Sequence, residues 1–159
     1  MTTELDRLTD VRVTRTGLDE QELDLIDRAR HGGATWAQIA TALGLGTRQA
    51  AEQRRQRLLA ARRSRRQYLD LSLSPQIVAL RAAVVDLDRW IGADRLWDTR
   101  FRRAALVRST VDVALDAAPG SLYALALHLV TDLAAAGDQV PPPVRIVTGR
   151  LTTTLSTSH

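Results

Sequence analysis

Arginine is the residue type whose placement in this chain most clearly suggests chemistry. Residues 35–66 contain eight arginines and a single acid, Glu52, and so carry a net charge of +7. The other segments carry −3 (residues 1–34), −1 (residues 67–137) and +1 (residues 138–159), which together give the chain's overall +4. A guanidinium group binds phosphate or carboxylate oxygens through paired hydrogen bonds. Residues 35–66 therefore predict a localised surface for a polyanion.

Two helices are predicted to present this charge. Thr35 and Gln38 form a capping-box pair that starts a short helix, and Gly44 occupies the position where a left-handed residue usually ends one. Thr47 then caps a long helix that carries the arginines. The predicted buried residues are Trp36, Ile39, Ala40 and Leu43 in the short helix and Ala50, Ala51, Leu58 and Leu59 in the long one.

A short helix, a tight turn and a long basic helix are typical of a helix-turn-helix, whose second helix enters the major groove of DNA. Residues near the start of that helix reach base edges, where arginine suits guanine and glutamine suits adenine, at about 1–3 kcal/mol of discrimination per pair. Arginines further along would contact phosphates, and their contribution would weaken steeply with salt. The predicted base contacts are Thr47, Arg48, Gln49 and Gln53, and the predicted phosphate contacts are Arg54, Arg55, Arg57, Arg62, Arg63, Arg65 and Arg66.

The ordinary alternative for an arginine-rich helix is a solvated face held by ion pairs within the helix. Glu52 is the only acid between Ala34 and Asp70, so this segment cannot neutralise its own arginines. Like charges one helical turn apart repel each other. The charge pattern therefore favours double-stranded DNA as the partner, with RNA or an acidic protein surface as the alternatives.

The preceding residues are expected to complete a three-helix DNA-binding domain at residues 18–71. Residues 1–17 are predicted to be an N-terminal arm. A first helix is predicted over residues 20–30, with Asp19 as its cap. Its buried stripe is predicted to consist of Leu23, Ile26 and Ala29.

A second helical module is predicted at residues 74–137. Ser74 and Pro75 are a cap and a first helical residue, and apolar residues then recur at alternating spacings of three and four, which is an a/d seam. Two further helices are expected, over about residues 97–115 and 122–136. The seam suits a dimer interface and an intramolecular core equally, and it consists of Ile77, Leu80, Val84, Leu87 and Ile91.

The last segment, residues 138–159, is predicted to be a Pro-rich spacer and a flexible tail. Three consecutive prolines at 141–143 favour an extended conformation. Residues 145–147 could add a short strand, and the remainder is rich in Ser and Thr.

Several classes of function are not indicated. The chain has no cysteine, and its three histidines lack the spacing of metal ligands, so no metal, cofactor or catalytic residue is predicted. Neither a phosphate-binding glycine loop nor a nucleophile elbow is recognisable. No apolar run approaches the roughly 20 residues that span a bilayer, and the acidic N-terminus does not resemble a secretory signal. We therefore expect a cytoplasmic protein at the nucleoid.

Residues 33–58, GATWAQIATALGLGTRQAAEQRRQRL, resemble the helix-turn-helix of small actinobacterial transcriptional regulators, including those labelled heat-shock regulators. The matching positions are Ile39-Ala40, Leu43-Gly44 and Ala50, whereas Gln53 stands where many such proteins have an aliphatic residue. The resemblance implies a sequence-specific regulator of transcription.

The sequence thus predicts an all-α homodimer, with a three-helix headpiece that binds DNA and a three-helix module that dimerises and senses a small-molecule or protein effector. Two alternatives stay open. One is a nucleoid-associated protein that coats DNA without sequence preference. The other is a protein-interaction adaptor, such as a partner of RNA polymerase or an antitoxin.

Overall fold

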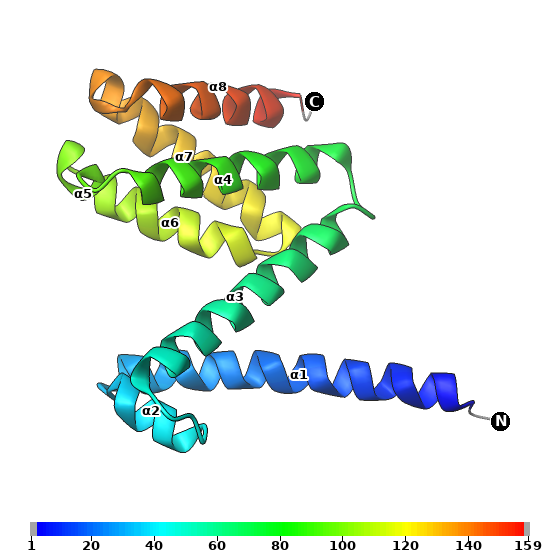
Figure 1. The fold of residues 1–159 in the computed structure, drawn as a ribbon. Helices are drawn as coiled ribbons and strands as arrows, with labels where there is room; N and C mark the ends of the chain where they lie inside the picture. Colours follow the sequence, from blue (N-terminus) through cyan, green and yellow to red (C-terminus); the bar gives the residue numbers. More distant parts are fainter. Residues whose placement is uncertain (1–2, 158–159) are drawn as a thin grey trace. The chain divides into compact units, whose positions relative to one another are not determined.

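The computed structural model describes residues 3–157, and within that range the chain is helical and has no strand (Figure 1). The all-α prediction is therefore confirmed. The chain divides into two compact units, Met1–Ser64 and Arg65–His159, so that the boundary falls within a helix. The sequence had suggested a boundary at residues 71–74.

The first unit is built on three helices, α1 (Glu4–His31), α2 (Trp36–Ala42) and the first part of α3 (Arg48–Asp70). Each contributes two fully buried apolar residues to one small core. Half-buried side chains, including Trp36 and Leu43, pack around it. The buried members are Leu23 and Ile26 from α1, Ile39 and Ala40 from α2, and Ala51 and Leu58 from α3.

The helix α1 begins much earlier than the sequence predicted. Thr3 caps it, because its hydroxyl accepts a hydrogen bond from the Asp6 N–H (3.1 Å) while the Asp6 carboxylate accepts one from the Thr3 N–H (2.8 Å). The prediction of an arm at residues 1–17 and a helix start near Glu20 is therefore wrong. The capping pattern at Asp19 lies inside a continuous helix, and Gly17 does not interrupt it.

The residues that begin and end α2 adopt the capping conformations that the sequence predicts. Thr35 and Gln38 form the reciprocal capping box, with the Thr35 N–H donating to Gln38 Oε1 at 2.8 Å. Gly44 adopts φ +68°, the left-handed conformation that glycine reaches at little cost. The Thr47 hydroxyl accepts a hydrogen bond from the Ala50 N–H at 3.0 Å. The turn between α2 and α3 thus has the caps that the sequence predicted.

The second unit contains more helices than predicted. After the end of α3 come α4 (Pro75–Ala93), α5 (Trp97–Arg100), α6 (Ala104–Asp116), α7 (Pro119–Ala136), the 3-10 turn η1 (Gly137–Gln139) and α8 (Pro142–Ser156). The helix α4 packs against α6, α7 and α8, and α7 packs against α6 and α8 (Figure 1). The predicted start of the helix at residue 122 is corrected to Pro119, whose fixed φ suits the first helical position.

The a/d seam on α4 lies inside this unit. Leu80, Val84 and Leu87 are 0% exposed, Ile91 is 2% exposed, and Ile77 packs partly buried against the same cluster. They are covered by α6, α7 and α8 of the same chain. Of the two alternatives for the seam, the intramolecular core is the one that forms, and the prediction that these residues are a dimer interface is wrong.

The last segment is a helix rather than a flexible tail. Pro142 stands at the start of α8, where a missing N–H costs nothing. Apolar residues spaced by three and four then face the core, and threonine hydroxyls on the other side bond back to carbonyls one turn earlier. The predictions of a mobile tail and of a strand at residues 145–147 are both wrong. The buried residues of α8 are Val144, Val147, Leu151 and Leu155.

One helical segment in the described residues, Pro119–Gln139, is long and apolar enough to cross a bilayer by length and composition alone. The expectation that no apolar run approaches that length is corrected accordingly. Leu122, Ala126 and Leu129 of this segment are 0% exposed against neighbouring helices. One face of this segment thus contributes to the core of the second unit.

Candidate nucleic-acid interface

The first four turns of α3 have an inner and an outer face. Ala51 and Leu58 point into the three-helix core and are 0% and 5% exposed. The four residues predicted to contact bases all lie on the exposed side, which fits the α-helical repeat of 3.6 residues. The exposed residues are Thr47, Arg48, Gln49, Gln53, Gln56 and Arg57.

Arg54 lies beside the inner face and is paired with α1. Its Nε donates to Glu22 Oε1 at 2.8 Å and its Nη2 to Glu22 Oε2 at 2.9 Å, a bidentate pair, while Asp19 Oδ1 lies 3.5 Å from Nη2. The Arg54 hydrogen bond lowers the pKa of Glu22, and the same bond raises the pKa of Arg54. Arg54 therefore holds α1 against α3.

Arg55 and Arg62 make similar contacts. Arg55 Nε donates to Asp27 Oδ1 at 2.6 Å. Arg62 Nη1 lies 3.4 Å from Asp24 Oδ1 and 3.9 Å from Glu20 Oε2. Three of the seven predicted phosphate contacts are thus neutralised by carboxylates from another helix.

The sequence interpretation missed these pairs because it weighed only the acids within the basic segment. The carboxylates come from α1, 28 to 42 residues earlier in the chain. Counted over the folded unit Met1–Ser64, eleven arginines face nine acids and the net charge is +2 rather than the +7 of residues 35–66. The excess charge of residues 35–66 is therefore largely balanced by acids elsewhere in the same unit.

Two arginines on the outer face keep their guanidinium groups available. Arg48 and Arg57 are exposed, and neither guanidinium has a hydrogen bond or ion pair to any residue in the part of the chain that the structure describes. Among the other predicted phosphate contacts, Arg63 is half-buried, and Arg65 and Arg66 belong to the second unit. The candidate interface thus centres on the first three turns of α3.

Gln56 is a further candidate that sequence reasoning did not select. Gln49, Gln53 and Gln56 follow one another at spacings of four and three, which places three amide side chains along one helix face. That spacing was visible in the sequence. Each amide offers two donors and an acceptor, as recognition of base edges requires.

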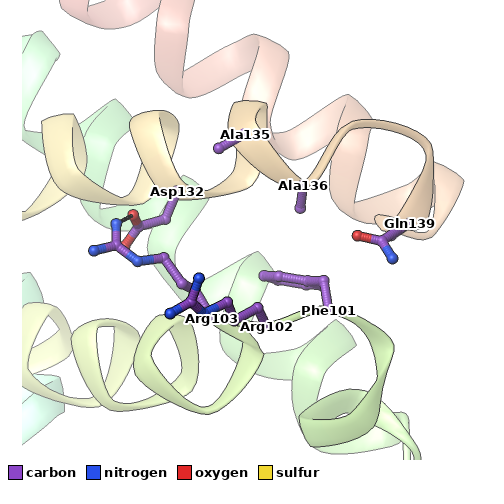
Figure 2. A pocket seen from close by; sticks show the side chains of 7 residues that line it. All are labelled: Phe101, Arg102, Arg103, Asp132, Ala135, Ala136 and Gln139. Carbon is purple, nitrogen blue, oxygen red and sulfur yellow. Dashed lines mark hydrogen bonds and ion pairs between the residues drawn. The ribbon is translucent and has the colours of Figure 1, made fainter.

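The second unit has a hollow of about 510 Å³ between α7 and the segment joining α5 to α6 (Figure 2). Arg103 forms an ion pair with Asp132, which is 8% exposed, so the two charges neutralise each other at its wall. Phe101, Arg102 and Gln139 also line it. This lining has no nucleophile and no proton-transfer pair. In addition, no group of three His, Cys, Asp or Glu residues within residues 3–157 could hold a metal ion.

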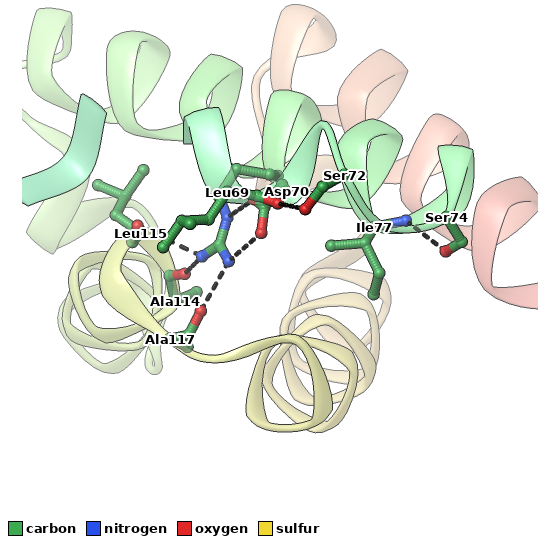
Figure 3. Close-up of polar contacts among 9 residues, drawn as sticks. Leu69, Asp70, Ser72, Ser74, Ile77, Ala114, Leu115 and Ala117 are labelled. Atoms are coloured by element: carbon green, nitrogen blue, oxygen red, sulfur yellow. Dashed lines mark hydrogen bonds and ion pairs between the residues drawn. The ribbon is translucent and has the colours of Figure 1, made fainter. Parts of the chain in front are cut away.

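A buried ion pair joins the end of α3 to α4 and α6 in the same unit. Arg81 is 2% exposed and Asp70 is 1% exposed, with Arg81 Nε 2.6 Å from Asp70 Oδ2 and Nη2 3.3 Å from Oδ1. The remaining guanidinium donors bond the carbonyls of Ala114 (2.7 Å), Leu115 (3.3 Å) and Ala117 (2.6 Å) (Figure 3). These carbonyls close the C-terminal end of α6, where a positive charge is favourable. The cluster is structural.

No protein-family model, curated protein or solved structure matches the chain at a significant level. The resemblance of residues 33–58 to actinobacterial regulators therefore stays a prediction.

Proposed function

We propose that the first unit binds double-stranded DNA through a helix-turn-helix formed by α2 and α3, and that the chain is a sequence-specific transcriptional regulator. The observation that carries the proposal is the outer face of α3. Arg48, Gln49, Gln53 and Arg57 are exposed there on a helix whose opposite side is fixed in a three-helix core. An α-helix with its side chains is about 10–12 Å wide and fits a major groove about 12 Å wide.

The roles of the arginines follow from their partners. Arg48, with Gln49 and Gln53, stands where the recognition helix starts, and arginine and glutamine are the residue types that read guanine and adenine. Arg57 is two turns further along and is assigned to phosphate. Arg54, Arg55 and Arg62 are assigned to holding α1 against α3, since their guanidinium groups already bond carboxylates.

The modest net charge of the unit favours a regulator over a protein that coats DNA. Binding without sequence preference depends almost entirely on phosphate neutralisation. The unit Met1–Ser64 has a net charge of only +2, and Arg54, Arg55 and Arg62 of its α3 are paired with carboxylates of α1. Affinity for a particular site would then have to come from base contacts by the outer face.

The test begins with selection of bound sequences from a random duplex library, followed by fluorescence anisotropy. The double variant Arg48→Ala/Gln49→Ala should lose at least tenfold affinity for the selected site and much less for random duplex, as expected for about 1–3 kcal/mol per base contact. Arg57→Ala should weaken both alike and reduce the slope of log K against log salt by about 0.9.

Arg95→Ala/Arg102→Ala is the matched control, since it removes two exposed arginines from the second unit and should leave both affinities unchanged. Equal losses on selected and random duplex for Arg48→Ala/Gln49→Ala would overturn the assignment of base contacts. If the wild-type chain binds no duplex at low salt, the proposal fails and the adaptor alternative, in which the same face meets an acidic protein, gains support.

A further inference from the structure

The N-terminal half of α1 carries apolar side chains that no described residue of the first unit covers. None of residues 3–22 is buried, and the first core residue of α1 is Leu23. Leu8, Val11 and Leu18 are 65%, 52% and 58% exposed, and Leu25 is 51% exposed on the same side. The helix therefore extends well beyond the three-helix core with an apolar stripe on its surface.

A helix of this kind is marginal alone. Most helical stability in proteins comes from burying an apolar face, and residues 4–22 of α1 bury none. The segment also contains Val11, Val13 and Gly17, residue types with low helix propensity. A partner that covers the stripe would explain why the segment is helical.

The spacing of the stripe is that of a coiled coil. Leu8 and Val11 are three residues apart, and Val11, Leu18 and Leu25 follow at intervals of seven. All three d positions are apolar, whereas only the first of the three a positions is. The a positions are Leu8, Arg15 and Glu22, and the d positions are Val11, Leu18 and Leu25.

The C-terminal end of the stripe opens into an apolar groove between α1 and α2. The groove has a volume of about 640 Å³. Leu18 and Leu25 of α1 form one wall, and Ile39, Ala42 and Leu43 belong to the wall from α2. One end of α1 thus offers a groove and the other end offers an uncovered apolar helix.

We propose that two copies of this chain associate through antiparallel pairing of their α1 helices, each copy placing the N-terminal half of its α1 in the groove of the other. Charge selects the direction. Parallel pairing in register would oppose Arg15 to Arg15, which is unfavourable. Antiparallel pairing instead sets Leu8 of one copy against Leu25 of the other, Val11 against Glu22, and Arg15 against Leu18.

The flanking charges also suit this direction. Arg12 and Asp19 occupy equivalent positions beside the seam one heptad apart, so antiparallel pairing brings Arg12 of one copy near Asp19 of the other. Glu22 is already neutralised by Arg54 of its own chain, which lowers the cost of placing Val11 beside it. The surface is separate from the outer face of α3, and the proposal does not depend on DNA binding.

Sedimentation equilibrium of the full chain without DNA tests the association. The wild-type chain should sediment at twice the mass of one chain, and Leu8→Glu/Val11→Glu should sediment at that of one, since neither residue contributes to the core of its own unit. Thr9→Glu/Val13→Glu is the matched control. It adds the same two charges on exposed positions off the stripe and should remain dimeric.

The absence of native cysteine allows the direction to be tested by oxidation. Leu8→Cys/Leu25→Cys should form a disulfide-linked dimer, whereas Leu8→Cys alone should not. A wild-type chain that stays monomeric at every concentration, or a Leu8→Cys variant that cross-links on its own, would overturn the proposal. Because Leu8→Glu/Val11→Glu should still bind a single half-site, failure of dimerisation and failure of DNA binding are distinguishable.

Discussion

Removing Asp70 should destabilise the second unit far more than removing an exposed acid. In Asp70→Ala, Arg81 keeps its three hydrogen bonds to the carbonyls of Ala114, Leu115 and Ala117 but loses both bonds to the carboxylate. The guanidinium remains 2% exposed in the native fold. It therefore becomes a buried positive charge whose only partners are neutral carbonyl groups.

The magnitude follows from that burial. Breaking a buried ion pair by removing one partner costs about 3–5 kcal/mol, because the other charge is left without compensation. A domain of this size has a total stability of about 5–15 kcal/mol. Asp70→Ala should thus remove a large part of the free energy of unfolding of the second unit. Asp98→Ala breaks an exposed ion pair, in which the Asp98 side chain is 55% exposed and the Arg108 side chain 42% exposed. This substitution should cost no more than about 1 kcal/mol.

Urea unfolding followed by tryptophan fluorescence measures the difference. Trp97 reports on the second unit, since it is 0% exposed, donates to the Ala104 carbonyl at 2.8 Å and stacks edge-on against Phe101. A Trp36→Phe background removes the signal of the first unit. Equal losses in Asp70→Ala and Asp98→Ala would refute the reasoning that burial makes the Asp70 pair essential.

Three further outcomes are expected. Leu151→Ala should lower the free energy of unfolding by about 2–5 kcal/mol in urea titration, because the side chain is 0% exposed, whereas a mobile tail would show no change. The Arg54 hydrogen bond holds the pKa of Glu22 below its ordinary value of 4.5. The ionised Glu22 carboxylate therefore stabilises the fold fully above pH 4.5, and this stabilisation is lost as the pH falls through the lowered pKa of the folded state. Glu22→Gln should accordingly be less stable than wild type at neutral pH and converge with it in acid, as thermal melts across pH would record; a constant difference would contradict the assignment. Gly17→Ala should stabilise α1 by about 0.5–1 kcal/mol, since an added Cβ meets nothing within 4 Å. If circular dichroism shows unchanged helicity and the stability is also unchanged, α1 is not continuous through this position.

The candidate site was predicted in part. Thr47, Arg48, Gln49 and Gln53 are exposed at the start of α3, where the sequence placed them, and their contact with bases stays a prediction. The phosphate contacts were predicted less well, because a run of arginines does not reveal which of its members face another helix. Arg55 and Arg57 are two residues apart, yet one bonds Asp27 and the other is exposed.

The sequence by itself determined where several of the helices begin and end. The caps at Thr35 and Thr47, the left-handed Gly44 and the Ser74-Pro75 start are all decided by hydrogen bonds or backbone conformations within about four residues. Such contacts are local, so residue types alone specify them. These local contacts are enough to predict the all-α class and the succession of helix, turn and helix in the first unit.

The tertiary structure decided which surfaces are covered. An apolar stripe must be buried, but its pattern does not say by what, and the seam of α4 is covered by α6, α7 and α8 of its own chain. In the same way, Arg54, Arg55 and Arg62 of α3 are paired with carboxylates of α1 that lie 28 to 42 residues earlier in the sequence. Burial and ion pairing act through space, so only the packing of distant segments fixes them.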